Sequence, residues 1–200
     1  MIETANTILS RFRKIDDVEF EHVAYRTRVP HVAPLAYLTV VFKPAPASVR
    51  LARTRDPLLP SALSRLFEEV NGANLFSDAL IIYGFRPDHY LLERKDWLRN
   101  ALPHDLVEVN REYERDLTSR NMVCFADYVY DRSLVLLDRL SERVTCLVGD
   151  DFNHVRTSWE SVDEWLTAEV ARLATLFDED GRLLLGEQAT LPSRTREPSS

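Results

Sequence analysis

The sequence has few of the residues on which several common functional sites depend. It contains five glycines among 200 residues, and it has no Walker A, dinucleotide-binding or G-x-S-x-G pattern. A phosphate-binding loop or a nucleophile elbow is therefore not predicted. The chain also lacks an apolar run long enough to span a bilayer, and it lacks a basic start followed by an apolar core. We accordingly expect a cytoplasmic protein with no membrane partner.

Metal binding and disulfide chemistry have little support either. The two cysteines, Cys124 and Cys146, have no CxxC spacing and fall in apolar segments, which favours buried free thiols over a disulfide. None of the five histidines lies three to five residues from another histidine or from a cysteine, as zinc ligands commonly do. The sequence predicts no catalytic residue, no cofactor and no metal site.

The excess charge is acidic and confined to one segment. The net charge is −7, but residues 1–120 carry 17 acidic and 17 basic side chains. Residues 150–180 hold nine carboxylates and only two arginines. Such a field repels phosphate backbones, so direct nucleic-acid binding is disfavoured, and it attracts basic proteins. A solvated acidic helix face, which needs no partner, explains the same pattern. Only three of the 25 basic residues are lysine, a bias that suggests a GC-rich bacterial genome.

Residues 59–84 predict an amphipathic helix, a loop and a buried strand. Pro60 suits the first helical turn, and Asn71-Gly72 is expected to end the helix through a left-handed residue. The apolar run 79–83 ends at Gly84 and is typical of a strand that is covered on both faces. The apolar side chains that share one helical face are Leu63, Leu66, Phe67 and Val70.

Periodicity predicts further elements along the chain. They are a helix over 1–15, a strand over 37–42, a helix over 105–115, strands over 122–130, 134–137 and 144–148, and a helix over 161–177. Short turns between the last three strands favour antiparallel pairing. Ser161-Val-Asp-Glu164 is a capping box, and Trp165 lies on the buried face of the helix that it starts. The sequence thus predicts an α/β (α+β) fold with a central mixed, largely antiparallel sheet flanked by helices.

The domain organisation follows from these elements. Residues 1–57 are expected to be an N-terminal extension with one strand and a proline-rich connector, packed on the same domain. Residues 58–185 form the main domain. Residues 186–200 are polar, contain two prolines and are expected to be a disordered tail.

One mixed group of aromatic and acidic residues is a candidate partner-binding surface. Asp127, Tyr128, Tyr130 and Asp131 lie on or beside one predicted strand, where alternation places the two tyrosines on the same face. Tyrosines flanked by carboxylates are common where basic proteins bind, and they are also common on half-buried sheets. The acidic residues that extend this candidate surface are Asp150, Asp151, Asp178, Glu179 and Asp180.

An ordered series of short motifs covers roughly residues 58–180. It consists of Leu59-Pro60, Leu66-Phe67, Asn71-Gly72, Ile82-Tyr83-Gly84, Leu106, Asn110, Cys124-Phe-Ala-Asp127, Ser158-Trp159, Trp165-Leu166 and Glu169. In this series the chain resembles the SUKH superfamily, which includes yeast cell-wall-synthesis regulators and many bacterial immunity proteins.

The resemblance implies an α/β fold and a function in protein binding. In bacteria it implies an immunity protein that neutralises a cognate toxin, often a nuclease, by direct contact. The acidic segment 150–180 would complement the basic cleft that a nuclease needs. The alternative is a regulatory or scaffolding module that binds a housekeeping protein, as the eukaryotic relatives do. A third possibility is an enzyme whose site is assembled from residues distant in the sequence.

Overall fold

The computed structural model describes residues 3–12, 18–20, 24–27, 39–45, 59–76, 78–86, 103–177 and 183–193. The helices in these ranges are α1 (Ala5–Phe12), α3 (Ser61–Glu69), α5 (Leu106–Glu112), α6 (Glu114–Ser119), α7 (Val162–Ala174) and the 3-10 helix η2 (Glu187–Thr190). The strands are β1 (Val18–Phe20), β2 (Ala24–Thr27), β3 (Thr39–Phe42), β4 (Ala73–Leu75), β5 (Leu80–Ile82), β6 (Met122–Tyr128), β7 (Ser133–Asp138), β8 (Val144–Val148) and β9 (Asp151–Trp159).

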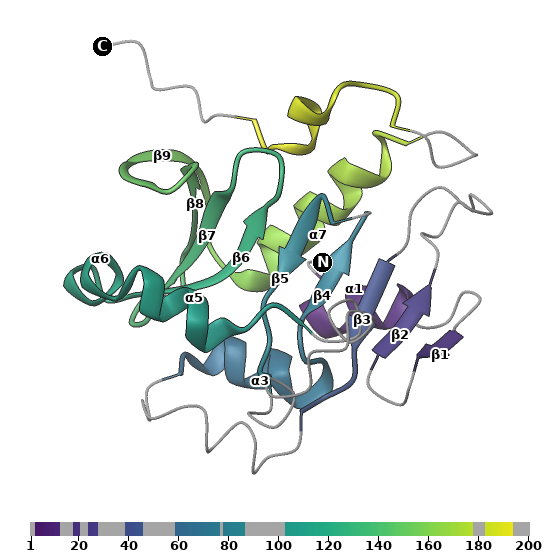
Figure 1. The fold of residues 1–200 in the computed structure, drawn as a ribbon, viewed down its shortest axis with the longest axis horizontal. Helices are drawn as coiled ribbons and strands as arrows, with labels where there is room; N and C mark the ends of the chain where they lie inside the picture. The colour runs from purple at the N-terminus through teal and green to yellow at the C-terminus, as the bar shows by residue number, and fades with distance from the viewer. Residues whose placement is uncertain are drawn as a thin grey trace.

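The strands form one sheet whose spatial order follows the chain order from β1 to β9. Every pair of neighbouring strands in it is antiparallel, which confirms the predicted α+β class and the largely antiparallel sheet. In the view of Figure 1, α7 lies behind the strands, and α5 and α6, which contact β6, lie below them. Helix α1 packs against both α7 and α3, so the N-terminal extension joins the same body as the rest of the chain.

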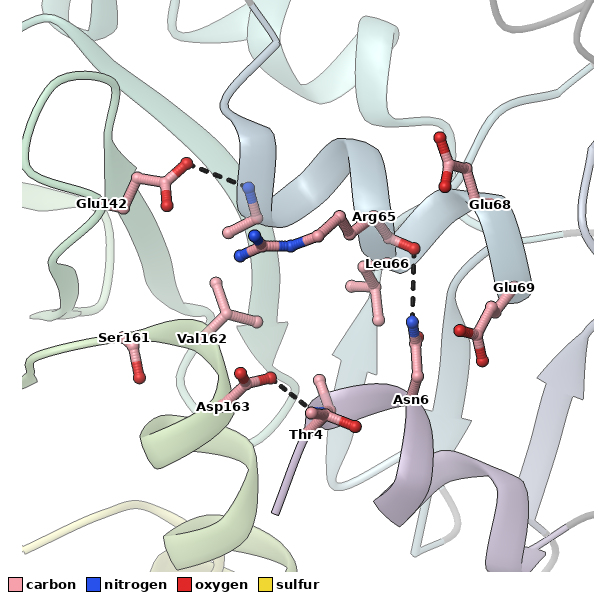
Figure 2. A pocket seen from close by; sticks show the side chains of 12 residues that line it. Thr4, Asn6, Arg65, Leu66, Glu68, Glu69, Glu142, Ser161, Val162 and Asp163 are labelled. Atoms are coloured by element: carbon pink, nitrogen blue, oxygen red, sulfur yellow. Dashed lines mark hydrogen bonds between the residues drawn. The ribbon is translucent and has the colours of Figure 1, made fainter. Parts of the chain in front are cut away.

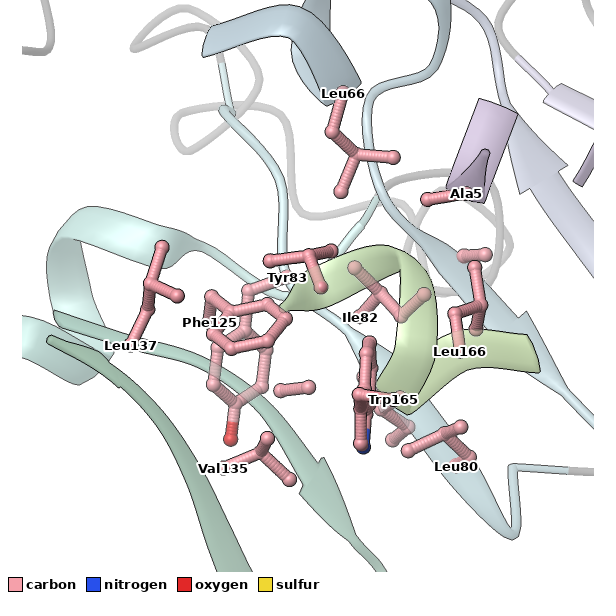
Figure 3. Close-up of a cluster of buried hydrophobic side chains, with 14 of the residues drawn as sticks. Ala5, Leu66, Leu80, Ile82, Tyr83, Phe125, Val135, Leu137, Trp165 and Leu166 are labelled. Atoms are coloured by element: carbon pink, nitrogen blue, oxygen red, sulfur yellow. The ribbon is translucent and has the colours of Figure 1, made fainter. Parts of the chain in front are cut away.

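The core forms between the sheet and α7. Trp165 is fully buried. Its ring packs edge-to-face with the ring of Phe125, and the two ring centroids are 5.0 Å apart. Figure 3 shows Trp165 and Leu166 of α7 among side chains of β5, β6 and β7. Helix α3 adds Leu63, Leu66 and Phe67, the apolar stripe that the sequence predicts.

The end of α3 differs from the prediction. The helix ends at an extended Val70, and the left-handed residue, Gly72 with φ +87°, lies two positions later. A Cβ on Gly72 would come within 2.5 Å of the Ile82 carbonyl oxygen. Glycine is therefore required where β4 begins beside β5, rather than as a helix cap.

Two asparagines take the place of missing strand partners. The Asn71 side chain accepts a hydrogen bond from the Phe85 N–H (2.7 Å) and donates one to the Phe85 carbonyl (2.9 Å). The Asn110 side chain accepts one from the Cys124 N–H (3.0 Å) and donates one to the Cys124 carbonyl (2.7 Å). Each amide thus satisfies a pair of backbone groups, as a neighbouring strand would. The first contact joins the segment after α3 to the segment after β5, and the second fixes α5 against β6.

Several helix and strand boundaries differ from the predicted ones. The helix predicted over 105–115 divides at Tyr113 into α5 and α6, and the helix predicted over 161–177 ends at Ala174. The capping box forms only in part, because the Ser161 hydroxyl accepts from the Glu164 N–H while the Glu164 carboxylate accepts from the Glu160 N–H. The strand predicted over 37–42 begins at Thr39 in the described residues.

The expected domain limits change at both ends. The N-terminal extension contributes three strands, β1 to β3, where the sequence predicts one. Residues 46–58, which include most of the proline-rich connector, lie outside the described residues. At the other end, residues 186–193 of the predicted disordered tail are ordered. Arg172 donates hydrogen bonds to the carbonyls of Ala189 (2.8 Å) and Thr190 (2.6 Å), which hold this segment on α7.

Candidate partner-binding pocket

The predicted tyrosine pair does not form a surface. Strand β6 ends at Tyr128, whose side chain is fully buried and accepts a hydrogen bond from the indole N–H of Trp165 at 3.3 Å. Its hydroxyl also hydrogen-bonds Glu169, and burial is the main cause that raises its pKa. Tyr130 lies beyond the strand in a turn and is 46% exposed. Tyr128 is therefore a core residue, which corrects the prediction.

Asp127 is also buried, with 7% of its surface exposed. The phenol of Tyr83 donates a hydrogen bond to its carboxylate, and the Oδ1 atom has no hydrogen-bond partner in the described part of the chain. Burial raises the pKa of Asp127 to about 6, although the Tyr83 hydrogen bond and the nearby Arg132 charge oppose this shift. Asp127 therefore cannot contribute to an exposed acidic surface.

The other predicted acids divide into three groups. Asp131 is partly buried and pairs with the buried guanidinium of Arg156 at 2.7 Å. Asp150 and Asp151 are exposed, and Asp151 hydrogen-bonds the exposed His154. Residues 178–180, the remaining candidates, lie outside the described residues. The predicted surface thus reduces to Tyr130, Asp150 and Asp151 among the described residues.

A pocket of about 540 Å³ lies elsewhere, where the N-terminal ends of α1 and α7 meet one side of α3. Its lining comes from four segments that are distant in the sequence (Figure 2). The lining residues are Thr4, Ala5, Asn6, Ala62, Arg65, Leu66, Glu68, Glu69, Glu142, Ser161, Val162 and Asp163. Four of them are carboxylates and one is an arginine, so the formal charge of the lining is negative.

Two of these carboxylates hold helix ends together. Asp163 of α7 accepts a hydrogen bond from the Ala5 N–H at the start of α1 (2.6 Å). Glu142, in the turn between β7 and β8, accepts from the Ala62 N–H (2.9 Å) and the Ser61 hydroxyl (2.6 Å) at the start of α3. The hydrogen bond from Ser61 is the largest of the causes that lower the pKa of Glu142. Both acids are therefore fixed in position by the helix starts that they cap, and the lowered pKa keeps Glu142 charged at neutral pH.

The remaining charged side chains project from the exposed face of α3. Glu68 and Glu69 are exposed, and the Asn6 side chain donates a hydrogen bond to the Arg65 carbonyl at 3.3 Å. In Figure 2 the Arg65 side chain extends along the pocket, and its guanidinium ends in the region between Glu142 and Asp163. The pocket has an apolar floor and a charged rim, an arrangement suited to long cationic side chains.

The described residues offer little for other chemistry. They contain no group of three His, Cys, Asp or Glu side chains that could hold a metal ion. None of their helices combines the length and apolarity that crossing a bilayer requires. Cys124 and Cys146 are free and buried, as predicted, on strands separated by β7. Burial is the main cause that raises the pKa of each thiol.

Comparison with known proteins identifies no relative: no family model, no curated protein and no solved structure matches the chain. The pocket itself could not be found from the sequence. Ser161 is part of the predicted capping box, but Glu68, Glu69 and Glu142 carry no local pattern that distinguishes them from solvated surface charge. Only the folded chain brings them beside the first turn of α1.

Proposed function

We propose that this chain is an immunity-type protein that neutralises a cognate toxin by direct binding, and that a basic surface of the toxin contacts the pocket between α1, α3 and α7. The observation that carries the proposal is the pocket lining, which contains four carboxylates from three separate segments and one arginine. The resemblance to the SUKH superfamily supports the same function. A nuclease toxin has a basic cleft that such a lining would complement.

The mechanism needed is binding without chemistry. Charged residues at a rim act mainly on the association rate, because they steer a partner of opposite charge over distances near the Debye length. The apolar floor, made by Ala62, Leu66 and Val162, would supply contact area once the partner is seated. A protein bound over the active cleft of a nuclease blocks its substrate, and this inhibition requires no catalytic group on the inhibitor.

The first test is co-expression. Reading frames adjacent to the gene for this chain are expressed alone and together with it, and growth is followed. We expect one of them to arrest growth alone and to be tolerated when the chain is present. If none is toxic, or if the chain does not restore growth, the proposed function is wrong, and the alternative of a regulatory module that binds a housekeeping protein is favoured.

The second test locates the contact. The double variant Glu68→Lys/Glu69→Lys reverses two exposed charges at the pocket, and Glu112→Lys/Glu114→Lys reverses two exposed charges on α5 and α6. We expect the first pair to weaken binding of the purified toxin about tenfold, mostly through the association rate, and the second pair to change it less than about twofold. Equal effects of the two pairs would place the contact outside the pocket.

A further inference from the structure

The two capping carboxylates of the pocket are held by hydrogen bonds from the starts of α1 and α3. Asp163 accepts from the Ala5 N–H with Oδ1, and Glu142 accepts from the Ser61 hydroxyl and the Ala62 N–H with Oε1, and also from the Ser61 N–H. In the described part of the chain no hydrogen bond involves the second oxygen of Asp163, Oδ2. A carboxylate that is already fixed by a cap loses little conformational entropy when it binds a further cation. The pocket therefore holds two preorganised acceptors on opposite sides.

Arg65 extends into the same space from α3. Its side chain is exposed, and its charge helps to lower the pKa of Glu142. Figure 2 shows the guanidinium near the middle of the pocket, between the elements that carry Glu142 and Asp163. Within the described residues it forms no hydrogen bond or ion pair with either acid. Arg65 thus places a guanidinium in the pocket without fixing it there.

We infer that the pocket is a receptor for one arginine side chain of the partner, and that Arg65 is an internal competitor which the incoming guanidinium displaces. The carboxylates of Glu142 and Asp163 bind the guanidinium, and Leu66 and Val162 contact its aliphatic stem. Arginine suits the site better than lysine, because its planar group presents several donors to two separated acceptors. This inference rests on the proposed function for the partner's identity, but the pocket can be tested without a partner.

The probe is N-acetylarginine amide, titrated into the isotopically labelled full chain and followed by backbone NMR shifts. N-acetylcitrulline amide, which has a similar shape and no charge, is the ligand control. We expect saturable shifts at Ala5, Ala62 and Val162 with the arginine probe and none with the citrulline probe. Shifts spread over the whole surface, or equal shifts with both probes, would overturn the inference.

The variant Arg65→Met keeps an unbranched apolar stem and removes the competing charge. We expect it to bind the arginine probe about threefold more tightly, since one like charge near the site is removed. Glu142→Gln and Asp163→Asn retain a capping oxygen, and each should weaken probe binding by a similar factor. Glu112→Gln, which also removes one negative charge, is the charge-matched control and should leave binding unchanged. Weaker or unchanged binding by Arg65→Met would refute the competitor role.

Failure of the arginine receptor can be distinguished from failure of the proposed function. If a toxin binds the chain and excess N-acetylarginine amide neither competes with it nor shifts the pocket residues, the function stands and the arginine receptor is wrong. If the probe binds with the expected dependence on Arg65 and no adjacent reading frame is toxic, the receptor stands and the immunity function is wrong.

Discussion

At the scale of single residues, the least usual group is the carboxyl of Asp127. It lies where β6 faces β5, almost fully buried, with one oxygen bound to the Tyr83 phenol and the other without a partner in the described residues. Burial raises its pKa from 3.8 to about 6, so the folded chain holds this proton more tightly than the unfolded chain does. Its stabilising contribution is complete below about pH 4 and is lost as the pH rises through 6.

The variant Asp127→Asn should remove this pH dependence. The ionised carboxyl costs the folded state about 3 kcal/mol at neutral pH, and an asparagine can still accept the Tyr83 hydrogen bond. We expect the variant to raise the free energy of unfolding by about 1 to 3 kcal/mol at pH 7.5 and to gain less at pH 4.5. Urea denaturation at both pH values measures this difference. An equal gain in the free energy of unfolding at both pH values would contradict the raised pKa of Asp127.

Asp138 is a control for which the pH dependence of stability has the opposite sign. Its carboxylate accepts hydrogen bonds from the N–H groups of Ser141 and Leu140, and these lower its pKa. The stability that it contributes is present at neutral pH and is lost as the pH falls through the lowered pKa. Asp138→Asn should therefore destabilise the chain more at pH 7.5 than at low pH.

Gly84 is the position where a single added methyl group should destabilise the fold most. A Cβ there would lie 2.0 Å from the carbonyl oxygen of Asn71, a backbone atom that cannot move away alone. We expect Gly84→Ala to lower the free energy of unfolding by about 3 kcal/mol, because the shift would also break the Asn71 contacts with Phe85. Gly186→Ala, where no atom lies within 4 Å, is the matched control. Similar losses in both variants would show that the close approach is not decisive.

At the scale of elements, the Asn110 amide decides how α5 meets the sheet. It binds both backbone groups of Cys124, a residue with no exposed surface, and also donates to the Leu106 carbonyl at 2.8 Å. We expect Asn110→Ala to cost about 2 to 4 kcal/mol, because two buried backbone groups lose their partners. Asn153→Ala, on the exposed part of β9, should cost about 0.5 kcal/mol or less.

Denaturation and amide hydrogen exchange together test this prediction. The Cys124 N–H should exchange much faster in Asn110→Ala, since its acceptor is the Asn110 side chain. Unchanged protection of that N–H would mean that another group replaces the amide. Equal destabilisation by Asn153→Ala would show that the loss is not specific to the contact with β6.

The elements that the sequence predicted well are those with strong periodicity. Helix α3, strand β5 and the β6 to β8 meander have apolar residues at the expected spacing and turn residues between them. Strand β9 could not be predicted in the same way. It is a sheet edge with mostly exposed or half-buried side chains, so its residues look like the acidic surface segment that surrounds them.

Tyr128 shows why alternation failed at the candidate surface. The rule holds for a regular strand with one solvated face, and β6 is covered on both faces from Val123 to Tyr128. The register between β6 and β7 also shifts between Cys124 and Ala126, and the strand ends before Tyr130. A side chain two residues further along therefore points into a turn, and the two tyrosines do not share a surface.

At the scale of the whole molecule, the charge pattern of the sequence indicated a basic protein partner but not where on the fold this partner would bind. The carboxylates of residues 150–180 disperse in the fold: Glu169 is buried beside Arg172, Asp151 lies on β9, and Asp163 reaches the pocket. The pocket acids outside that segment belong to α3 and to the turn after β7. Because the site depends on long-range contacts among four segments, composition alone could not place it.

The same contacts make α1 part of the domain and one wall of the pocket. Ala5, Ile8 and Leu9 are almost fully buried against the rest of the chain, and the first N–H of the helix binds Asp163. Burial of these three side chains stabilises the fold by about 4 kcal/mol. Removal of α1 should therefore affect both the stability of the molecule and the geometry of the pocket.

Deletion of residues 2–12 tests this coupling. We expect the free energy of unfolding to fall by about 4 kcal/mol and N-acetylarginine amide to lose its saturable binding, because Asp163 is no longer held by the Ala5 N–H. If the deleted chain does not fold, Leu9→Ala replaces it: the full-length variant should lose about 2 to 4 kcal/mol and keep the Asp163 cap and probe binding. If the truncated chain kept its free energy of unfolding and its binding of the probe, α1 would contribute neither to the stability of the fold nor to the pocket.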